Sequence, residues 1–190
     1  MTELVLGHAT YEDLLKVPDH LVAELIDGKL YSSPRPAPRC LNVTTSLGAD
    51  LNAWFQRGRG GPGGWWILDE PELDLVGQIL VPDTAGWRRE RLPFLPDAPA
   101  IDIAPDWVCE VQSPSTARFD RVKKLPVYSG HGVLHVWLVD PSVRTLEVLS
   151  LENGRWILAG NYHGDDIVRA EPFEAVEIEL GALWIDGPVS

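Results

Sequence analysis

The stretch "DWVCEVQSPSTARFDRVKKLPVY", from Asp106 to Tyr128, predicts a strand followed by a helix. Its first part is short, apolar and rich in β-branched and aromatic residues, as strands are. The part from Ala117 to about Tyr128 is helix-like, and another strand-like run, "LHVWLVD", follows at residues 134–140. Together these segments predict a strand–helix–strand unit within a mixed α/β fold.

The segments on either side predict more strands and few helices. The pair Asp27 and Gly28 in "AELIDGKLYSS" predicts a hairpin turn, and Asn153 and Gly154 predict another hairpin near the end of the chain. Apolar residues from 41 to 55 recur at roughly helical spacing. Further strands are predicted in "WWILDEPELDLV", "QILVP" and "TAGWRR". With 190 residues and only short Gly/Pro-rich loops, we expect one domain, residues 1–190, around a central sheet.

The charge balance limits the partners of the chain. Sixteen basic and 28 acidic residues give a net charge of -12, which repels nucleic acid and anionic membranes unless basic groups gather locally. This argues against a simple DNA-binding module. Short basic clusters could make phosphate contacts if the fold brings them together, and could equally be dispersed in solvent: Arg57 and Arg59; Arg88, Arg89 and Arg91; Arg118, Arg121, Lys123 and Lys124.

The cysteine spacing, the first residues and the number of tryptophans give three further expectations. Cys40 and Cys109 lie in no CxxC or zinc-ligand spacing, so neither a disulfide framework nor a structural zinc site is predicted. The first residues resemble no signal peptide, and no apolar run is long enough to span a bilayer, so we expect a cytoplasmic protein. Eight tryptophans, among them Trp65, Trp66 and Trp137, are many for one core and predict a homodimer.

Two carboxylates lie in segments that should be buried. Asp83 follows the apolar run "ILVP", and Glu110 lies inside "WVCEVQ", where alternation puts it on one face with Gln112. An edge strand with one wet face would explain Glu110, and an ordinary Pro-Asp turn would explain Asp83. If the two converge to about 4 Å, they repel by about 4 kcal/mol, so a proton or a divalent cation must lie between them.

The same residues carry a resemblance to a known family. Pro82-Asp83, followed by Glu110-Val111-Gln112 on a strand before a helix, resembles the PD-(D/E)XK nuclease superfamily. Four segments together are similar to the small bacterial restriction endonuclease family of the Uma type: "ELIDGKL", "ILVPDTAGWRRERLP", "PDWVCEVQSPSTARFDRVKKLPVYSGHGV" and "HVWLVDP". The similarity runs from about Tyr11 to Pro141. It implies a restriction-endonuclease-like fold, with a central mixed sheet flanked by helices and additional β-hairpins.

The resemblance also implies a metal site. It assigns Asp83 and Glu110 as ligands of Mg²⁺ or Mn²⁺, with the backbone carbonyl of Val111 as a third ligand. A hard cation of this kind prefers oxygen ligands and leaves room for phosphate oxygens. Glu24 corresponds to an early acidic position that binds a second metal ion or holds a metal-bound water, although it could also be simply the polar residue of a hairpin strand.

A lysine is the remaining expected part of the site. The superfamily places it two positions after the strand acid, where this chain has Gln112. In the Uma type the lysine moves to the following helix, which maps onto Lys124. There it could orient or deprotonate the attacking water, or stabilise charge on the phosphate. From the sequence alone, a solvated helix lysine is the simpler interpretation.

The implied function is a metal-dependent endonuclease that hydrolyses phosphodiester bonds of nucleic acid, and DNA is the expected substrate. Two departures from the family pattern bear on it. Cys40 stands where relatives commonly carry a histidine, and Pro126 lies in the predicted helix, where it could end or kink the helix beside Lys124. The alternative is a catalytically degenerate member of the fold that acts as a protein-interaction or regulatory module.

Overall fold

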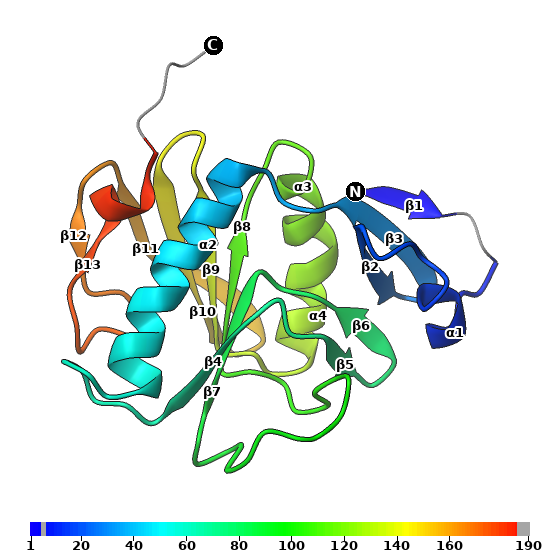
Figure 1. Ribbon diagram of the computed structural model, residues 1–190, viewed down its shortest axis with the longest axis horizontal. Helices are drawn as coiled ribbons and strands as arrows, with labels where there is room; N and C mark the ends of the chain where they lie inside the picture. The colour runs from blue at the N-terminus through cyan, green and yellow to red at the C-terminus, as the bar shows by residue number, and fades with distance from the viewer. Residues whose placement is uncertain (5–6, 186–190) are drawn as a thin grey trace.

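A six-stranded mixed sheet forms the centre of the molecule (Figure 1). The computed structural model describes residues 1–4 and 7–185. The strand order is β11-β10-β9-β8-β7-β4. β8 and β9 pair in parallel, and the other neighbours pair antiparallel. The bounds are β4 (Trp65–Asp69), β7 (Thr84–Arg88), β8 (Trp107–Val111), β9 (His135–Asp140), β10 (Thr145–Glu152) and β11 (Arg155–His163).

A helical segment connects the two parallel strands, as the sequence predicts. It consists of α3 (Ala117–Phe119), a π-helical turn η2 (Asp120–Lys124) and α4 (Leu125–Gly130). Pro126 lies in the first turn of α4, a position that tolerates proline. The helix therefore does not end beside Lys124. It widens there into a π-helical turn, a feature that is frequent at functional sites.

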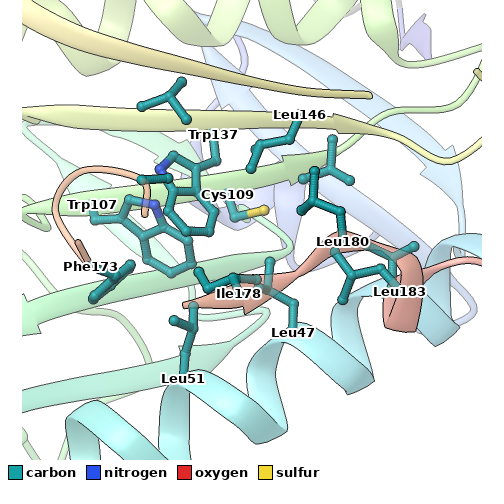
Figure 2. Packing of buried hydrophobic residues seen from close by; sticks show 14 of the residues in the cluster. Leu47, Leu51, Trp107, Cys109, Trp137, Leu146, Phe173, Ile178, Leu180 and Leu183 are labelled. Carbon is teal, nitrogen blue, oxygen red and sulfur yellow. The ribbon is translucent and has the colours of Figure 1, made fainter. Parts of the chain in front are cut away.

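Helices cover both faces of the central sheet. Helix α2 (Pro38–Leu51), which continues into the π-helical turn η1 (Asn52–Gln56), packs on one face, and Figure 2 shows its Leu47 and Leu51 pointing toward Trp107 and Cys109 of β8. On the other face, Val108 of β8 packs in one cluster with Tyr128 of α4. The alternation predicted for β8 is confirmed. Because β8 is central and buried along its whole length, the interpretation of a wet edge strand is wrong.

A second sheet lies beside the crossover segment (Figure 1). Its order is β1-β3-β2-β6-β5, and α1 (Tyr11–Leu14) precedes β2. The predicted hairpin turn is present between β2 and β3, where Asp27 and Gly28 have φ of 52° and 68°. This sheet comprises β1 (Thr2–Leu4), β2 (Leu21–Ile26), β3 (Lys29–Pro34), β5 (Leu73–Leu75) and β6 (Gln78–Leu80). Residues 81–83 connect β6 to β7, so they link the two sheets.

The remaining described elements close the far end of the core. The strands β12 (Ile167–Val168) and β13 (Ile178–Glu179) form a two-stranded sheet, followed by the 3-10 helix η3 (Leu180–Leu183). Ile178, Leu180 and Leu183 pack with the residues of α2 and β8 in one cluster (Figure 2). In the part of the chain that the structure describes, no helix has the length and apolar character needed to cross a membrane.

Two of the three tryptophans on which the homodimer prediction was based belong to the core. Trp65 and Trp137 are 4% and 0% exposed, and both rings pack against Phe173, with centroids 5.0 and 5.6 Å away. Trp66 is half-buried and donates its indole N–H to the carbonyl oxygen of Leu92. The tryptophan content therefore supplies no argument for an interface, and the homodimer stays a prediction without this support.

We predict that truncating the buried face of α2 is costly while truncating its exposed face is not. Leu47 is 2% exposed and Leu41 is 45% exposed on the same helix. Leu47→Ala should lower the free energy of unfolding by about 2–5 kcal/mol, because it leaves a cavity against the sheet. Leu41→Ala should change it by less than about 0.5 kcal/mol. Urea unfolding of both variants checks this, and equal losses would contradict the packing of α2.

Candidate active site

Four segments bring charged residues to one cavity of about 280 Å³. Strand β2 of the smaller sheet carries Glu24, and the link between β6 and β7 carries Asp83. Strand β8 carries Glu110, and the crossover segment carries Lys124. All four side chains line the cavity. The site therefore lies where the two sheets and the crossover segment meet, and it depends on residues separated by up to 100 positions.

The ammonium group of Lys124 is buried at the centre of this arrangement. Its Nζ lies 3.0 Å from Oε1 of Glu24 and 3.1 Å from each carboxylate oxygen of Glu110. It also donates to the carbonyl oxygen of Val81 at 3.2 Å and lies 4.0 Å from Asp120. With its side chain 5% exposed, Lys124 is not a solvated helix lysine. The simpler interpretation from the sequence is wrong.

Glu110 has a second donor that the sequence analysis did not identify. The hydroxyl group of Tyr128 donates to Oε1 of Glu110 at 2.6 Å, and both side chains are buried. Asp120, Lys124 and Tyr128 follow one another at intervals of four residues, which places them on one face of a helical segment. That spacing is visible in the sequence and could have indicated that Tyr128 accompanies Lys124.

Asp83 is tied to β8 through the backbone. Its Oδ2 accepts a hydrogen bond of 2.7 Å from the N–H of Val111, which also lines the cavity. The side chain is half-buried. Asp83, in the link before β7, and Glu110, on β8, thus both reach one cavity.

Glu24 has one satisfied and one unsatisfied oxygen. Its Oε1 accepts a hydrogen bond of 2.9 Å from the N–H of Val81, in addition to the contact with Lys124. Its Oε2 is buried and has no hydrogen-bond partner among the described residues. A buried carboxylate oxygen without a partner is costly, so it is a place where a water or a cation can bind.

Gln112 is not part of this group. It does not line the cavity, and its Oε1 accepts a hydrogen bond of 3.3 Å from Arg121, which forms a bidentate pair with Glu147 at 2.9 and 3.0 Å. Cys40 does line the cavity, and its Sγ lies 3.9 Å from the carbonyl oxygen of Gln112. Burial raises the pKa of the Cys40 thiol, so it stays protonated and is no replacement for a charged histidine.

Burial shifts the pKa values of three carboxyl groups around Lys124: those of Asp83, Glu110 and Asp120. Burial raises the pKa of both Asp83 and Asp120 to about 6, with Lys124 opposing the shift. Burial also raises the pKa of Glu110 well above its usual value. For Lys124, burial opposes the charged form, but Glu110, Glu24 and the two aspartates together raise its pKa well above the usual value.

Of the residues in the predicted basic clusters, only Lys124 is among the described residues that line this cavity. Arg88 and Arg89 lie over the rings of Trp65 and Trp66, at 4.5 and 4.0 Å. Arg91 pairs with Asp106, and Arg57 and Arg59 line a different cavity.

Arg35, which the sequence analysis did not single out, does line the cavity of Asp83 and Lys124. It pairs with Glu70 at 2.7 Å, and Glu70 donates its N–H to the carbonyl oxygen of Asp83 at 3.1 Å.

The donors at the cavity suit a hard cation in their chemistry. They are carboxylate oxygens and backbone carbonyls, the ligands that Mg²⁺ and Mn²⁺ prefer, and Oε2 of Glu24 lacks a partner. Both oxygens of Glu110, however, are in contact with Lys124. Among the described residues, no group of three or more His, Cys, Asp or Glu side chains is arranged to hold a metal ion. The residues fit a metal ion in type, while Lys124 contacts three of the carboxylate oxygens, both of Glu110 and Oε1 of Glu24.

Comparisons with known proteins agree with this fold. The model of the Uma2 family, described as "putative restriction endonuclease", matches residues 9–182. A crystal structure of a putative nuclease belonging to DUF820, from Anabaena variabilis ATCC 29413, is similar to the chain with a TM-score of 0.74 and 22% sequence identity. The match covers 92% of this chain and 96% of that one, and it shows the restriction-endonuclease-like fold that the sequence predicts. None of the curated proteins compared with the chain matches it.

We predict that the hydroxyl group of Tyr128 stabilises the fold through Glu110. Tyr128→Phe should lower the free energy of unfolding by about 1.5–3 kcal/mol, because a buried carboxylate loses a donor. Tyr11→Phe is the matched control, since Tyr11 makes a 2.7 Å hydrogen bond to Glu72 in a half-exposed position. It should cost less than about 1 kcal/mol. Urea unfolding measures both variants. Similar decreases in the free energy of unfolding would show that the hydrogen bond to Glu110 stabilises the fold no more than an exposed one does.

We predict that the charge of Asp120 destabilises the metal-free protein as the pH rises. Its pKa is 3.8 in a model peptide and about 6 in the fold, so the folded state holds the proton more tightly. The resulting stabilisation is complete below about pH 4 and is lost as the pH rises to about 6. Asp120→Asn mimics the protonated form, so its stability relative to wild type should increase over this interval, by no more than about 3 kcal/mol.

Thermal melts in the presence of a chelator at several pH values test the Asp120 prediction. Asp97→Asn, at an exposed loop position, is the control, and its difference from wild type should stay constant with pH. A constant difference for Asp120→Asn as well would mean that the folded and unfolded states bind the proton equally.

Proposed function

Because the chain belongs to the Uma2 family of putative restriction endonucleases, we propose that it is a metal-dependent nuclease that hydrolyses phosphodiester bonds. The observation that carries this proposal is the convergence of Asp83, Glu110 and Lys124 on one cavity. The three come from different segments of the chain and line the same cavity. DNA is the first substrate to test, because the family is described as one of restriction endonucleases, which cleave DNA.

Asp83 and Glu110 are the proposed metal ligands, together with the carbonyl oxygen of Val111. Their side chains line one cavity, and the hydrogen bond that the N–H of Val111 donates to Asp83 joins the two segments that carry the proposed ligands. Bound there, Mg²⁺ or Mn²⁺ supplies positive charge that polarises the phosphate and lowers the pKa of the attacking water. Glu24 contributes a further carboxylate, whose free Oε2 can accept a proton or hold a water in place.

Lys124 is the proposed source of the charge that Gln112 cannot supply. Its neighbouring carboxylates raise its pKa, so it remains an ammonium group at neutral pH. A protonated lysine cannot take a proton from water, so we exclude deprotonation of the water and assign Lys124 an electrostatic role. It stabilises negative charge that develops on the phosphate.

Arg35 is the proposed contact for the nucleic acid backbone. It is a half-exposed guanidinium that lines the same cavity as Asp83, and its partner Glu70 is also half-exposed. An exposed ion pair of this kind is weak, so a phosphate group can replace Glu70 at little cost. A local contact of this type is needed, because the net charge of -12 otherwise repels the substrate.

A second candidate is a non-catalytic interaction or regulatory module with the same fold. It is favoured by the contact of Lys124 with both oxygens of Glu110, which leaves that carboxylate satisfied without a metal ion. Titration with Mn²⁺ in a calorimeter separates the two functions. Binding that is lost in Glu110→Ala supports the nuclease, and the absence of binding supports the module.

We predict cleavage of DNA or RNA that depends on Mg²⁺ or Mn²⁺ and on both carboxylates. Asp83→Ala and Glu110→Ala should each lower the cleavage rate by at least about 100-fold, because each removes a ligand and charge at the reacting phosphate. Asp97→Ala, in an exposed loop, should cleave as wild type does. The assay uses purified protein with single- and double-stranded substrates. Equal cleavage by wild type and both site variants would exclude this cavity as the active site.

A further inference from the structure

The oxygens around Lys124 form a cation site that the ammonium group fills. Three separate groups lie within 3.0–3.2 Å of its Nζ: Glu24, Glu110 and the carbonyl oxygen of Val81. The two oxygens of Glu110 are equally distant, as in a carboxylate that holds one cation symmetrically. Oxygen atoms of this type also bind hard divalent cations. The ammonium group and a metal ion at Glu110 therefore require the same atoms.

We propose that Lys124 is the resident cation of the metal-free site, and that a divalent metal ion binds Glu110 only as Lys124 releases it toward Glu24 and Val81. This inference rests on the proposed function, because it assumes that Glu110 is a metal ligand. Lys124 then controls when the site can hold its metal ion, in addition to stabilising the phosphate.

The structure provides a place for the released ammonium group. Its contacts with Oε1 of Glu24 and with the carbonyl oxygen of Val81 do not involve Glu110 and can persist. Oε2 of Glu24, buried and without a partner among the described residues, can accept the hydrogen bond that Glu110 gives up. A lysine side chain has a flexible four-carbon stem, so a small rotation suffices. The charge therefore stays buried and paired throughout.

The hydrogen bonds that hold the proposed ligands in place do not involve Lys124. Asp83 accepts its hydrogen bond from Val111, and among the described residues no ion pair within 4.0 Å joins it to the ammonium group. Glu110 keeps the hydroxyl group of Tyr128 on Oε1 when Lys124 moves. The carboxylates of Asp83 and Glu110 thus stay in position to receive a metal ion, and removing the lysine should leave a site that binds more tightly.

Calorimetric titration with Mn²⁺ tests the competition. Lys124→Met should bind Mn²⁺ at least tenfold more tightly than wild type, whereas Lys123→Met, at the half-exposed neighbouring lysine, should bind as wild type does. Adding Glu110→Gln to Lys124→Met should abolish the gain, because the gain arises at Glu110. Removing a nearby positive charge raises the affinity for a cation by itself, so a variant of unchanged net charge is needed beside Lys124→Met.

The loss of a buried cation could unfold Lys124→Met, so a second variant keeps the test decisive. Lys124→Met combined with Glu24→Gln removes one positive and one negative charge, a change that buried pairs often tolerate. This double variant should also bind Mn²⁺ more tightly than wild type. Its thermal melting temperature should rise more on addition of Mn²⁺ than that of wild type.

The outcomes separate this inference from the proposed function. If wild type binds Mn²⁺, loses it in Glu110→Gln, and the lysine variants bind no more tightly, the competition is wrong and the metal site stands. If neither wild type nor the lysine variants bind Mn²⁺, both the metal site and the competition are wrong. Tighter binding in the lysine variants that persists without Glu110 would also overturn the competition.

Discussion

The burial of one ammonium group among four carboxylates is the constraint on which the rest of the structure depends. Lys124 contacts Glu24 from the smaller sheet and Glu110 from the central sheet, and it donates to the link between them at Val81. A charge at this depth is tolerated only when its partners are in place. The hairpin, the link between the sheets and the crossover segment must therefore all be correctly positioned for the lysine to be accommodated.

Much of the fold was predictable from the sequence, because strands and turns depend on interactions between residues that are close together in the chain. Alternation in "WVCEVQ" assigns Trp107 and Glu110 to opposite faces, and the structure confirms it. Asp27 and Gly28 favour a tight turn for conformational reasons, and they form one. Pro126 was a less reliable guide, because it lies in the first turn of α4, where a proline is tolerated.

The site was only partly predictable, because its residues interact over long distances in the sequence. The burial of Lys124 depends on partners 100 and 43 positions away, and no local pattern around a lysine contains that information. Only the family resemblance singled it out. The arginines near residue 88 illustrate the reverse case, since their charge density suggested phosphate contacts and the fold uses Arg88 and Arg89 to cover indole rings.

Val81 takes part in the site with its backbone alone. Its N–H donates to Glu24 and its carbonyl oxygen accepts from Lys124, so one peptide segment contacts both members of the buried ion pair. Every amino acid except proline provides these two groups. Natural variation at this position can therefore change the side chain freely and leave the chemistry intact. Scanning by alanine substitution would record position 81 as unimportant, although the site cannot be assembled without it.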